Sequence, residues 1–463
     1  MRELIAEQTA ESGTIGRRTL LKVAVLGAAG LAFTPALAGC STVGATSSRS
    51  SKTLKVVTTT QFPFGKLNAM KTLSKEDATA LGVGSLTLFK MLQAWKKKNP
   101  GITLEFQEIE PLAATQKALL AAQAGNPADV IWDNDLNIPQ LASGGYLTDL
   151  ADLPGDWNDY NQKLTALTSI DGSQFALPFT TDARMTVYNK VAFSNAGITD
   201  MPATWDEFNT ALAALKGAGK GGYGYWAGPF IHTPTMTILS TLWMLGGSVV
   251  DSAGKVNLST DEMRKTFEYY NSLMNVNNYT PSSLLNVSDQ DEYVKTLTDG
   301  DVSCQFDGSW VLGQFDDAGI GDQYGVFRTP RPSASSADST LSGFWAMMLP
   351  KQKKVDKART EIAFDFAMNF CGSKGQSTYI ADTVTLPTRK SVLEDKAIAD
   401  SKSDQWKFVA QYSVEAGRPM PNTTDNALLF DSIQTAFQSY LSGKASVQDA
   451  LAGGQQQFDS GKK

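Results

Sequence analysis

The sequence predicts an α/β protein made of two domains. A chain of 463 residues is long enough for two domains, because a domain has roughly 150 residues on average and domain sizes vary widely. Strand-like and helix-like segments alternate in a βαβαβ order between residues 53 and 132, and the alternation resumes after residue 190. This order is typical of parallel sheets joined by right-handed crossovers. Apolar residues make up 42% of the chain and charged residues 19%, which indicates a globular protein.

The composition argues against several classes of protein. The net charge of −6 differs from the basic balance of nucleic-acid-binding proteins, so we expect no nucleic-acid partner. The chain has one histidine, His232, and three cysteines, which excludes most histidine-based catalysis and most zinc sites. We therefore expect no metal and no cofactor.

The first forty residues predict an export signal. Arg17, Arg18 and Lys22 precede an apolar run, residues 23–38, that is short for a membrane span of about 20 residues. The run ends in Leu-Ala-Gly-Cys40, which resembles the lipobox of bacterial lipoproteins. The segment around the two arginines also resembles a twin-arginine signal, with Gly and Leu where that pattern has Ser and Phe, so both export routes stay open.

We expect residues 1–39 to be a signal peptide and Cys40 to be lipidated. Residues 40–52 are then a flexible tether, because a Ser/Thr/Gly-rich segment cannot bury a core. The folded part would be anchored to the outer face of the cell membrane through this tether. Cys304 and Cys371 either form a disulfide there or remain two buried thiols.

Polar residues follow two of the first strands. The strand at 53–60 is followed by a loop that begins with Gln61, and the strand at 129–132 is followed by Asp133-Asn-Asp135. Ligands bind at such strand ends in open α/β sheets. The alternative for Asp133 and Asp135 is a turn that caps the next helix. The other elements expected in this half are helices at 86–98, 113–124 and 138–143 and a strand at 102–107.

The run from Phe175 to Lys190 has an unusual pattern. Between Thr181 and Tyr188 the residues alternate, so that Asp182 and Arg184 share one face of a strand whose other face is apolar. One interpretation is a half-exposed strand with a surface ion pair. The other is a strand that leaves one domain, crosses a cleft and starts a second domain.

Downstream, two further connections and several aromatic residues stand out. Pro330 and Pro332 cannot continue a central strand and indicate a second connection, and Pro387-Thr-Arg389 is a candidate third. Trp226 and Phe230 end a short strand, and Trp310 follows a turn at a strand end, either as a ligand platform or as a core residue. The elements expected here are strands at 301–306, 323–327 and 343–350, helices that begin with capping boxes at Thr204 and Ser259, and helices at 234–246, 358–370, 391–400, 404–414, 427–441 and 446–458.

Taken together, these motifs carry a family likeness. The lipobox, Asn99-Pro-Gly101, the run from Asp129 to Asp135, Leu177-Pro178 to Lys190, Thr204-Trp-Asp-Glu-Phe208, Gly308-Ser-Trp310 and Met420-Pro-Asn422 occur in this order. The chain resembles an extracellular solute-binding protein of a bacterial ABC importer, of the maltose-binding-like type, over nearly all of residues 53–458.

The resemblance implies a two-lobed periplasmic-binding-protein-like fold of type II. Each lobe would hold a mainly parallel sheet flanked by helices, and three crossings would join the lobes. Residues 53–181 plus 330–388 would form the first lobe and 182–329 plus 389–463 the second. Hinges are expected at the crossings, around Thr181, Arg184, Thr329 and Pro387, where Arg184 either holds Asp182 in place or reaches the ligand.

The resemblance also implies a sugar held in the cleft by aromatic rings and a few carboxylates. The expected ligand-binding residues are Gln61, Asp133, Asp135, Asp182, Trp226, Phe230, Trp310, Phe344, Trp345 and Phe430. Phe430 stands where maltose binders carry a Trp, and residues 66–84 are longer than usual.

The expected function is capture of a carbohydrate, a di- or oligosaccharide, and its delivery to an ABC permease by a monomeric, membrane-anchored protein that is not an enzyme. The alternative is a secreted carbohydrate-active enzyme in which Asp133, Asp135 and Asp182 supply an acid and a base. A lipoprotein scaffold or adhesin is a third possibility. The sequence contains no Gly-x-Ser-x-Gly motif that would support a hydrolase.

Overall fold

The computed structural model describes residues 52–82, 84–110, 113–230, 233–251 and 253–462, which belong to one compact unit, Ser50–Lys463. The predicted signal peptide, Cys40 and His232 lie outside the described residues. Within the described part, no helix combines the length and the apolar character needed to cross a membrane.

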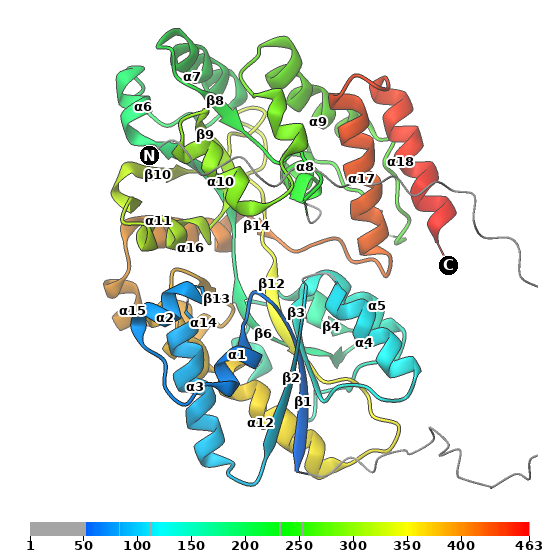
Figure 1. Ribbon diagram of the computed structural model, residues 1–463. Coiled ribbons are helices and arrows are strands. Elements are labelled where there is room, and N and C mark those ends of the chain that lie inside the picture. The colour runs from blue at the N-terminus through cyan, green and yellow to red at the C-terminus, as the bar shows by residue number, and fades with distance from the viewer. Residues whose placement is uncertain (1–51, 83, 111–112, 231–232, 252, 463) are drawn as a thin grey trace, which may run out of the picture. The chain divides into compact units, whose positions relative to one another are not determined.

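A six-stranded sheet forms the first lobe (Figure 1). Its order is β13-β6-β12-β3-β1-β2. Only β1 pairs in parallel, with β2 and β3, whereas β12 and β13 pair antiparallel with their neighbours. The strands are β1 Thr53–Thr59, β2 Thr103–Ile109, β3 Val130–Asn134, β6 Ala176–Thr181, β12 Phe344–Met348 and β13 Leu386–Pro387.

Helices and an aromatic core cover this sheet. The βαβαβ order predicted for residues 53–132 is confirmed, because α3 and α4 connect β1, β2 and β3. Behind β3, the fully buried Trp132 contacts the rings of Phe64, Phe179 and Phe370. The helices of this lobe are α1 Phe64–Ala69, α2 Lys75–Ala80, α3 Ser85–Lys98, α4 Ala113–Gln123, α5 Ile138–Ser143, α12 Lys357–Cys371 and α13 Ser373–Ala381.

A four-stranded sheet forms the second lobe. Its order is β10-β7-β9-β8, and only β8 and β9 are parallel. The strands are β7 Arg184–Asn189, β8 Gly222–Gly224, β9 Val302–Gly308 and β10 Tyr324–Phe327. The helices around it are α6 Lys190–Asn195, α7 Trp205–Gly217, α8 Thr233–Met244, α9 Asp261–Asn271, α10 Gln290–Thr298, α11 Val311–Asp317, α17 Asn426–Leu441 and α18 Val447–Gly461.

The two-lobed α/β fold is therefore confirmed, but the expectation of mainly parallel sheets is wrong for both lobes, because most strand pairs of the described residues are antiparallel in each sheet. The reason lies in the connections. A parallel pair needs a crossover within its own sheet. β7 instead arrives directly from the first sheet, and β10 leads back toward it, so both pair antiparallel with their neighbours.

The chain passes between the sheets at two places that lie side by side. β6 ends at Thr181 in one sheet and β7 begins at Arg184 in the other, so the first passage is Asp182-Ala183. The second passage runs from β10 to β12, and Phe344 at its end pairs with Thr181. A short parallel ribbon, β11 Thr340–Leu341 with β14 Gly417–Arg418, lies within these connections.

The third connection begins later than expected. Helices α14 Lys390–Leu393 and α15 Lys396–Ser401 both contact α13 of the first lobe, so residues 389–401 extend that lobe and do not open the second. Arg389 fixes this segment. Its buried guanidinium donates to the carbonyl oxygens of Cys371 and Gly155, each at 2.8 Å, and to the Tyr160 hydroxyl at 2.8 Å. Helix α16, Asp404–Ala416, follows.

One of the two predicted capping boxes is present. Thr204 and Glu207 cap α7 reciprocally. The box predicted at Ser259 is wrong, because Thr260 caps α9 by accepting from the Met263 N–H, and Met263 has no side chain that could bond back.

Gly84 provides a test of the packing under the 66–84 segment. It has φ +75°, and a Cβ there would lie 2.4 Å from the Tyr379 ring. We expect Gly84→Ala to lower the free energy of unfolding by about 3 kcal/mol, because backbone strain and overpacking add. Gly82→Ala is the matched control: φ is +104° there but no atom lies within 4 Å, so its cost is strain alone, about 1 kcal/mol. Urea denaturation measures both, and equal costs would contradict the predicted Tyr379 clash.

Candidate functional site

Asp135 lies at the carboxyl end of β3, at the start of the 3₁₀ turn Asp135–Asn137. Its side chain is fully buried. Neither carboxylate oxygen has a hydrogen-bonding partner among the described residues. The next residue, Leu136, is bonded to the second lobe, because Asn426 of α17 donates its Nδ2–H to the Leu136 carbonyl oxygen at 3.0 Å. A buried carboxylate without partners is costly, so this group requires a functional or structural explanation.

Asp182 and Arg184 flank the first passage between the sheets. The Arg184 Nη1–H donates to Asp182 Oδ1, and the Gly343 N–H donates to the same oxygen at 3.1 Å. The exposed fractions of the two side chains are 20% for Asp182 and 6% for Arg184. The Arg184 guanidinium also lies 5.1 Å from the centre of the Trp310 ring. The charged pair predicted on this strand therefore joins a buried Arg184 to a half-buried Asp182 at the junction of the lobes and is not a surface ion pair.

These groups converge on Gly343, just before β12. A Cβ on Gly343 would lie 3.5 Å from Asp135 Oδ1, 3.5 Å from Met420 Cε and 3.7 Å from Arg184 Nη1. Segments far apart in the sequence thus meet at one point. We call Asp135, Asp182, Arg184, Gly343 and Trp310 the central site.

Burial has the largest effect on the pKa values of the two carboxyl groups in the central site. Burial, with a smaller effect from the nearby charge of Asp182, raises the pKa of Asp135 to about 8. The charge of Arg184 and the N–H groups of Asp135 and Phe344, which do not reach hydrogen-bond geometry, oppose this rise. Burial also raises the pKa of Asp182, against the opposing effects of Arg184 and the Gly343 N–H. Two carboxyl groups share one guanidinium, so Asp135 holds a proton at neutral pH.

This arrangement predicts a pH dependence of stability. The pKa of Asp135 is 3.8 in its ordinary state and about 8 in the folded protein, so the folded state binds the proton more tightly. Its contribution is therefore complete below about pH 3.8 and is lost as the pH rises through 8. We expect the stability of Asp135→Asn relative to the native protein to rise between about pH 4 and pH 8 and to level off above that, as measured by thermal unfolding at closely spaced pH values. Parallel pH profiles would contradict the assignment.

The other predicted residues of the first lobe lie around β3 and β12. Asp133 is buried, and its Oδ1 accepts the Asn134 N–H at 2.8 Å, whereas Asn134 caps the turn that follows by accepting the Leu136 N–H. Gln61 is exposed in its loop. Phe344 is buried in the core. Trp345 is half-buried, and its ring meets the Phe62 ring edge-to-face at 5.2 Å.

Two aromatic residues predicted to bind ligand in the second lobe are buried in the structure. Trp226 is 3% exposed, and its ring is stacked with Phe230 at 5.2 Å and with Tyr293 at 3.8 Å. Phe430 is fully buried in the core beneath α17. Both rings are used for packing because they stand on the apolar faces of their elements. Phe230 is half-buried at the edge of this cluster, and Trp310 is half-buried beside Arg184.

Sequence reasoning missed two methionines and underestimated Arg184. The Sδ atom of Met236 on α8 lies 3.2 Å from Arg184 Nη2. Met420 Cε lies 3.5 Å from the position that a Cβ on Gly343 would occupy. Met420 belongs to the Met-Pro-Asn motif that carried part of the resemblance, so a signal existed for it. Nothing in the sequence pointed to Met236, which sits in an apolar helix.

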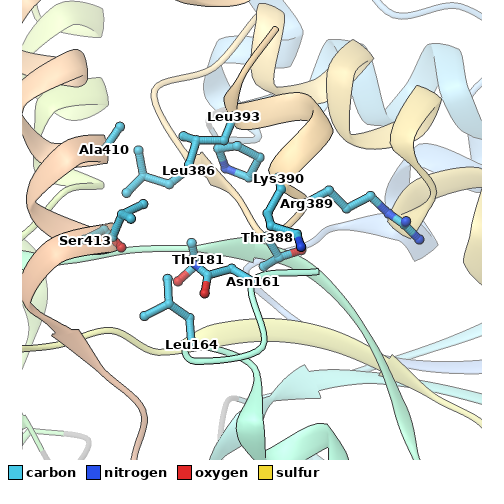
Figure 2. A pocket seen from close by; sticks show the side chains of 12 residues that line it. Asn161, Leu164, Thr181, Leu386, Thr388, Arg389, Lys390, Leu393, Ala410 and Ser413 are labelled. Atoms are coloured by element: carbon cyan, nitrogen blue, oxygen red, sulfur yellow. The ribbon is translucent and has the colours of Figure 1, made fainter. Parts of the chain in front are cut away.

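The residues expected at the hinges lie close to the passages. The Thr181 hydroxyl donates to the Gly343 carbonyl oxygen at 2.8 Å, and Thr181 and Pro387 line a small pocket with Ala410 and Ser413 of α16 (Figure 2). Thr329 is buried in the second passage. Figure 2 shows a mixed lining of leucines and of polar side chains such as Asn161 and Thr388, none of which belongs to the central site.

The described part of the chain lacks the side-chain clusters that hold metal ions. No group of three or more His, Cys, Asp or Glu side chains there is placed to hold a metal ion. Cys304 and Cys371 are two buried free thiols, which decides between the alternatives left open by the sequence.

The fold and the site together define the class of protein. Two α/β lobes joined by adjacent crossings, with a buried polar site where they meet, form the architecture of the two-lobed periplasmic binding proteins. Residues 90–404 match the model of the bacterial extracellular solute-binding protein family, and the chain belongs to this family.

Individual relatives are distant. The chain is 27% identical over 190 residues to a binding protein of Brucella abortus, which is 39% of this chain and 45% of that protein, so the match spans less than half of the relative's length. It is 36% identical over 86 residues to the diacetylchitobiose binding protein of Streptomyces coelicolor, which is 18% of this chain and 20% of that protein. The solved cyclic alpha-maltosyl-1,6-maltose binding protein from Arthrobacter globiformis superposes with a TM-score of 0.71 at 21% identity, covering 88% of this chain and 98% of that one.

Proposed function

We propose that this protein is the substrate-binding component of an ABC importer that captures a carbohydrate in the central site and delivers it to a membrane permease. The observation that carries the proposal is Asp135, a fully buried carboxyl group whose two oxygens are unpartnered, beside the Asp182–Arg184 pair at the junction of the lobes. Family membership supports solute capture. The names of the Streptomyces and Arthrobacter relatives support a saccharide.

The chemistry of the central site suits a polyhydroxyl ligand. A carboxylate accepts hydrogen bonds from two adjacent hydroxyl groups, and a guanidinium donates to their oxygens. Trp310 and Trp345 are half-buried rings that can cover the apolar C–H face of a sugar at low entropic cost. A hydroxyl group missing from the ligand would leave a buried polar group unpaired, at about 1–3 kcal/mol, which provides specificity.

The proposed mechanism is closure of the lobes around the ligand. Asp135 directly follows β3 of the first sheet and Arg184 begins β7 of the second, so a ligand that contacts both favours the closed state. We propose that Thr181, Arg184, Thr329 and Pro387 act at or beside the hinges. The lobes are proposed as residues 53–181 plus 330–401 and residues 182–329 plus 402–463, with the boundary moved from 388 for the reason given above.

The remaining parts of the proposal concern the cell. A lipid on Cys40 would anchor a monomeric protein to the outer face of the membrane, close to its permease. The protein would release its ligand unchanged and not act as an enzyme. This last point matters because a carboxyl group with a raised pKa, such as Asp135, is also a property of a catalytic acid.

A thermal-shift screen tests the proposal. The panel contains mono- and oligosaccharides, polyols and peptides, and we expect saccharides to raise the melting temperature because they bind the folded state alone. The bound sugar is then recovered and analysed by mass spectrometry, with an expected return of intact ligand. Stabilisation by peptides alone would refute the carbohydrate assignment, and recovery of cleaved sugar would refute the transport role.

A further inference from the structure

Exposed lysines gather at one edge of the first lobe, where its parallel strands begin. Thr53, the first residue of β1, pairs with Thr103, the first residue of β2. The Thr103 N–H also donates to the Lys52 carbonyl oxygen at 2.7 Å. Helix α3 ends at Lys98, only a few residues before β2, so its last turn lies at the same edge.

The loop between β12 and α12, residues 349–356, reaches this edge as well. β12 is antiparallel to β3, so the end of β12 lies beside the start of β3. The Gln352 Nε2–H donates to the Ala128 carbonyl oxygen at 2.8 Å, just before β3. The Arg359 Nη2–H donates to the Thr53 carbonyl oxygen at 2.7 Å. The loop and the first turn of α12 therefore lie beside the starts of β3 and β1 (Figure 1).

These segments make the edge basic. Lys98 pairs with Asp365 at 3.2 Å, and the exposed Lys357 lies 4.0 Å from Glu361. Within the described residues, the three lysines of the loop take part in no ion pair. The chain as a whole has a net charge of −6, so this positive charge is a local feature. We call the following exposed lysines the basic edge: Lys52, Lys97, Lys98, Lys351, Lys353, Lys354 and Lys357.

The basic edge has a limit and an apolar tip. The next strand beyond β12 is β6, and just before it Asp149 Oδ1 accepts the Gln174 N–H at 3.0 Å. The lysines are thus confined to the half of the edge that holds the start of β1. Val355 lies in the loop next to Lys354 and is 88% exposed, the largest value for a large apolar side chain among the described residues. Lysines around an exposed apolar side chain suit a surface that contacts anionic lipid.

We propose that the basic edge lies against an anionic lipid bilayer, with its lysines at the headgroups and Val355 between them. The proposal rests on one part of the proposed function, the lipid on Cys40. Cys40 precedes Thr53 by thirteen residues, which span at most about 45 Å when fully extended. Because β1 begins at the basic edge, the anchored segment would enter the fold there.

The lipid and the lysines have different roles in this arrangement. The lipid keeps the protein at the membrane, and the lysines determine which side of the first lobe faces it. Their attraction to anionic headgroups acts over about 10 Å at 0.1 M salt, so it operates only when this edge faces the bilayer. Asp135 follows the other end of β3, so the central site stays uncovered.

Vesicle sedimentation tests the proposal. The protein is the chain from residue 40 with Cys40→Ser, which contains the compact unit of residues 50–463 and has no lipid. We expect it to sediment with phosphatidylglycerol vesicles at low salt and to be released at about 1 M salt, where the Debye length falls to about 3 Å. Phosphatidylcholine vesicles should not bind it. Equal binding to both lipids, or binding to double-stranded DNA with none to the anionic vesicles, would overturn the proposal.

Charge reversal identifies the lysines involved. The triple variant Lys351→Glu/Lys353→Glu/Lys354→Glu should bind the anionic vesicles at least about tenfold more weakly. The matched control reverses three exposed lysines of the second lobe, Lys220, Lys255 and Lys265, and changes the net charge by the same amount. It should retain most of the binding. Equal losses in the two variants would attribute binding to net charge and overturn the basic edge.

A fluorescent label identifies the face in contact. Cys304 and Cys371 are buried, so Val355→Cys in the Cys40→Ser chain provides one exposed thiol for a polarity-sensitive dye. We expect a blue shift of the dye on anionic vesicles. The control is Val276→Cys in the second lobe, where the side chain is 66% exposed, and it should show no shift. A shift at position 276, or at neither position in the bound protein, would contradict the proposed orientation.

These outcomes separate the basic edge from the anchor. The vesicle experiments use a chain without lipid, so they give the same answer whether or not Cys40 is lipidated in the cell. Release of the full-length Cys40→Ser protein from cell membranes tests the anchor by itself.

Discussion

Asp135→Asn should weaken saccharide binding by about 100-fold at neutral pH. The amide has nearly the same shape as the carboxyl group, but its nitrogen only donates, so it lacks the second acceptor atom of a carboxylate that gives up its proton when the ligand binds. Each charge-assisted bond contributes about 1.5–3 kcal/mol. Because Asp135 holds a proton at pH 7 in the folded protein but is ionised in the unfolded chain, the substitution should not lower the free energy of unfolding at pH 7 and should raise it. Loss of binding with preserved stability is the signature of a ligand contact.

The matched control for Asp135→Asn is Asp365→Asn on α12. Asp365 accepts the Trp95 indole N–H at 2.8 Å in the first lobe and takes no part in the central site. An asparagine there retains an acceptor, so saccharide affinity should stay within about threefold of the native value. Calorimetry on both variants separates the two outcomes. Unchanged affinity in Asp135→Asn would remove Asp135 from the proposed site.

Arg359→Met should lower the free energy of unfolding by about 3–5 kcal/mol, because it leaves a buried carboxylate without its counter-ion. Arg359 Nε and Nη2 donate to the two oxygens of Asp129 at 2.6 Å each, and Nη2 also donates to the Thr53 carbonyl oxygen at 2.7 Å. Asp129 Oδ2 accepts the Lys55 N–H at 2.7 Å. The exposed fractions of the two side chains are 10% for Arg359 and 1% for Asp129, so water cannot replace the lost partner.

Lys357→Met is the control for Arg359→Met. Lys357 and Glu361 lie 4.0 Å apart on the same helix with side-chain exposures of 90% and 57%, and an exposed pair of this kind contributes less than about 0.5 kcal/mol. The double variant Asp129→Asn/Arg359→Met should recover part of the loss, since it leaves no unpaired charge. Urea denaturation followed by tryptophan fluorescence measures all three. A cost below about 1 kcal/mol for Arg359→Met would contradict the structural role.

Much of the fold follows from local patterns in the sequence. The β-branched run of β1, the periodic helices α3 and α12 and the Thr204 capping box were predictable because each depends on neighbours within one element. The pairing of β7 and β10 was not predictable in this way. Strand direction there is set by which lobe the chain arrives from, and this depends on contacts between residues far apart in the sequence.

The candidate binding residues also divide into those predictable from local sequence and those whose position depends on distant contacts. Asp135 and Asp182 were predictable because carboxylates at strand ends and on an apolar strand are costly unless they serve a purpose. The burial of Trp226 and Phe430 was not, because an aromatic residue at an element's edge packs into the core or faces a ligand according to its neighbours. Tyr293, which stacks on Trp226, lies on a helix far along the chain.

The most direct test of the account is a crystal structure of the protein with the saccharide that stabilises it most. We predict a sugar ring between the lobes, with hydroxyl groups within hydrogen-bonding distance of both Asp135 oxygens and of the Arg184 guanidinium. A saccharide bound away from the junction, with Asp135 still unpartnered, would contradict the assignment of the central site.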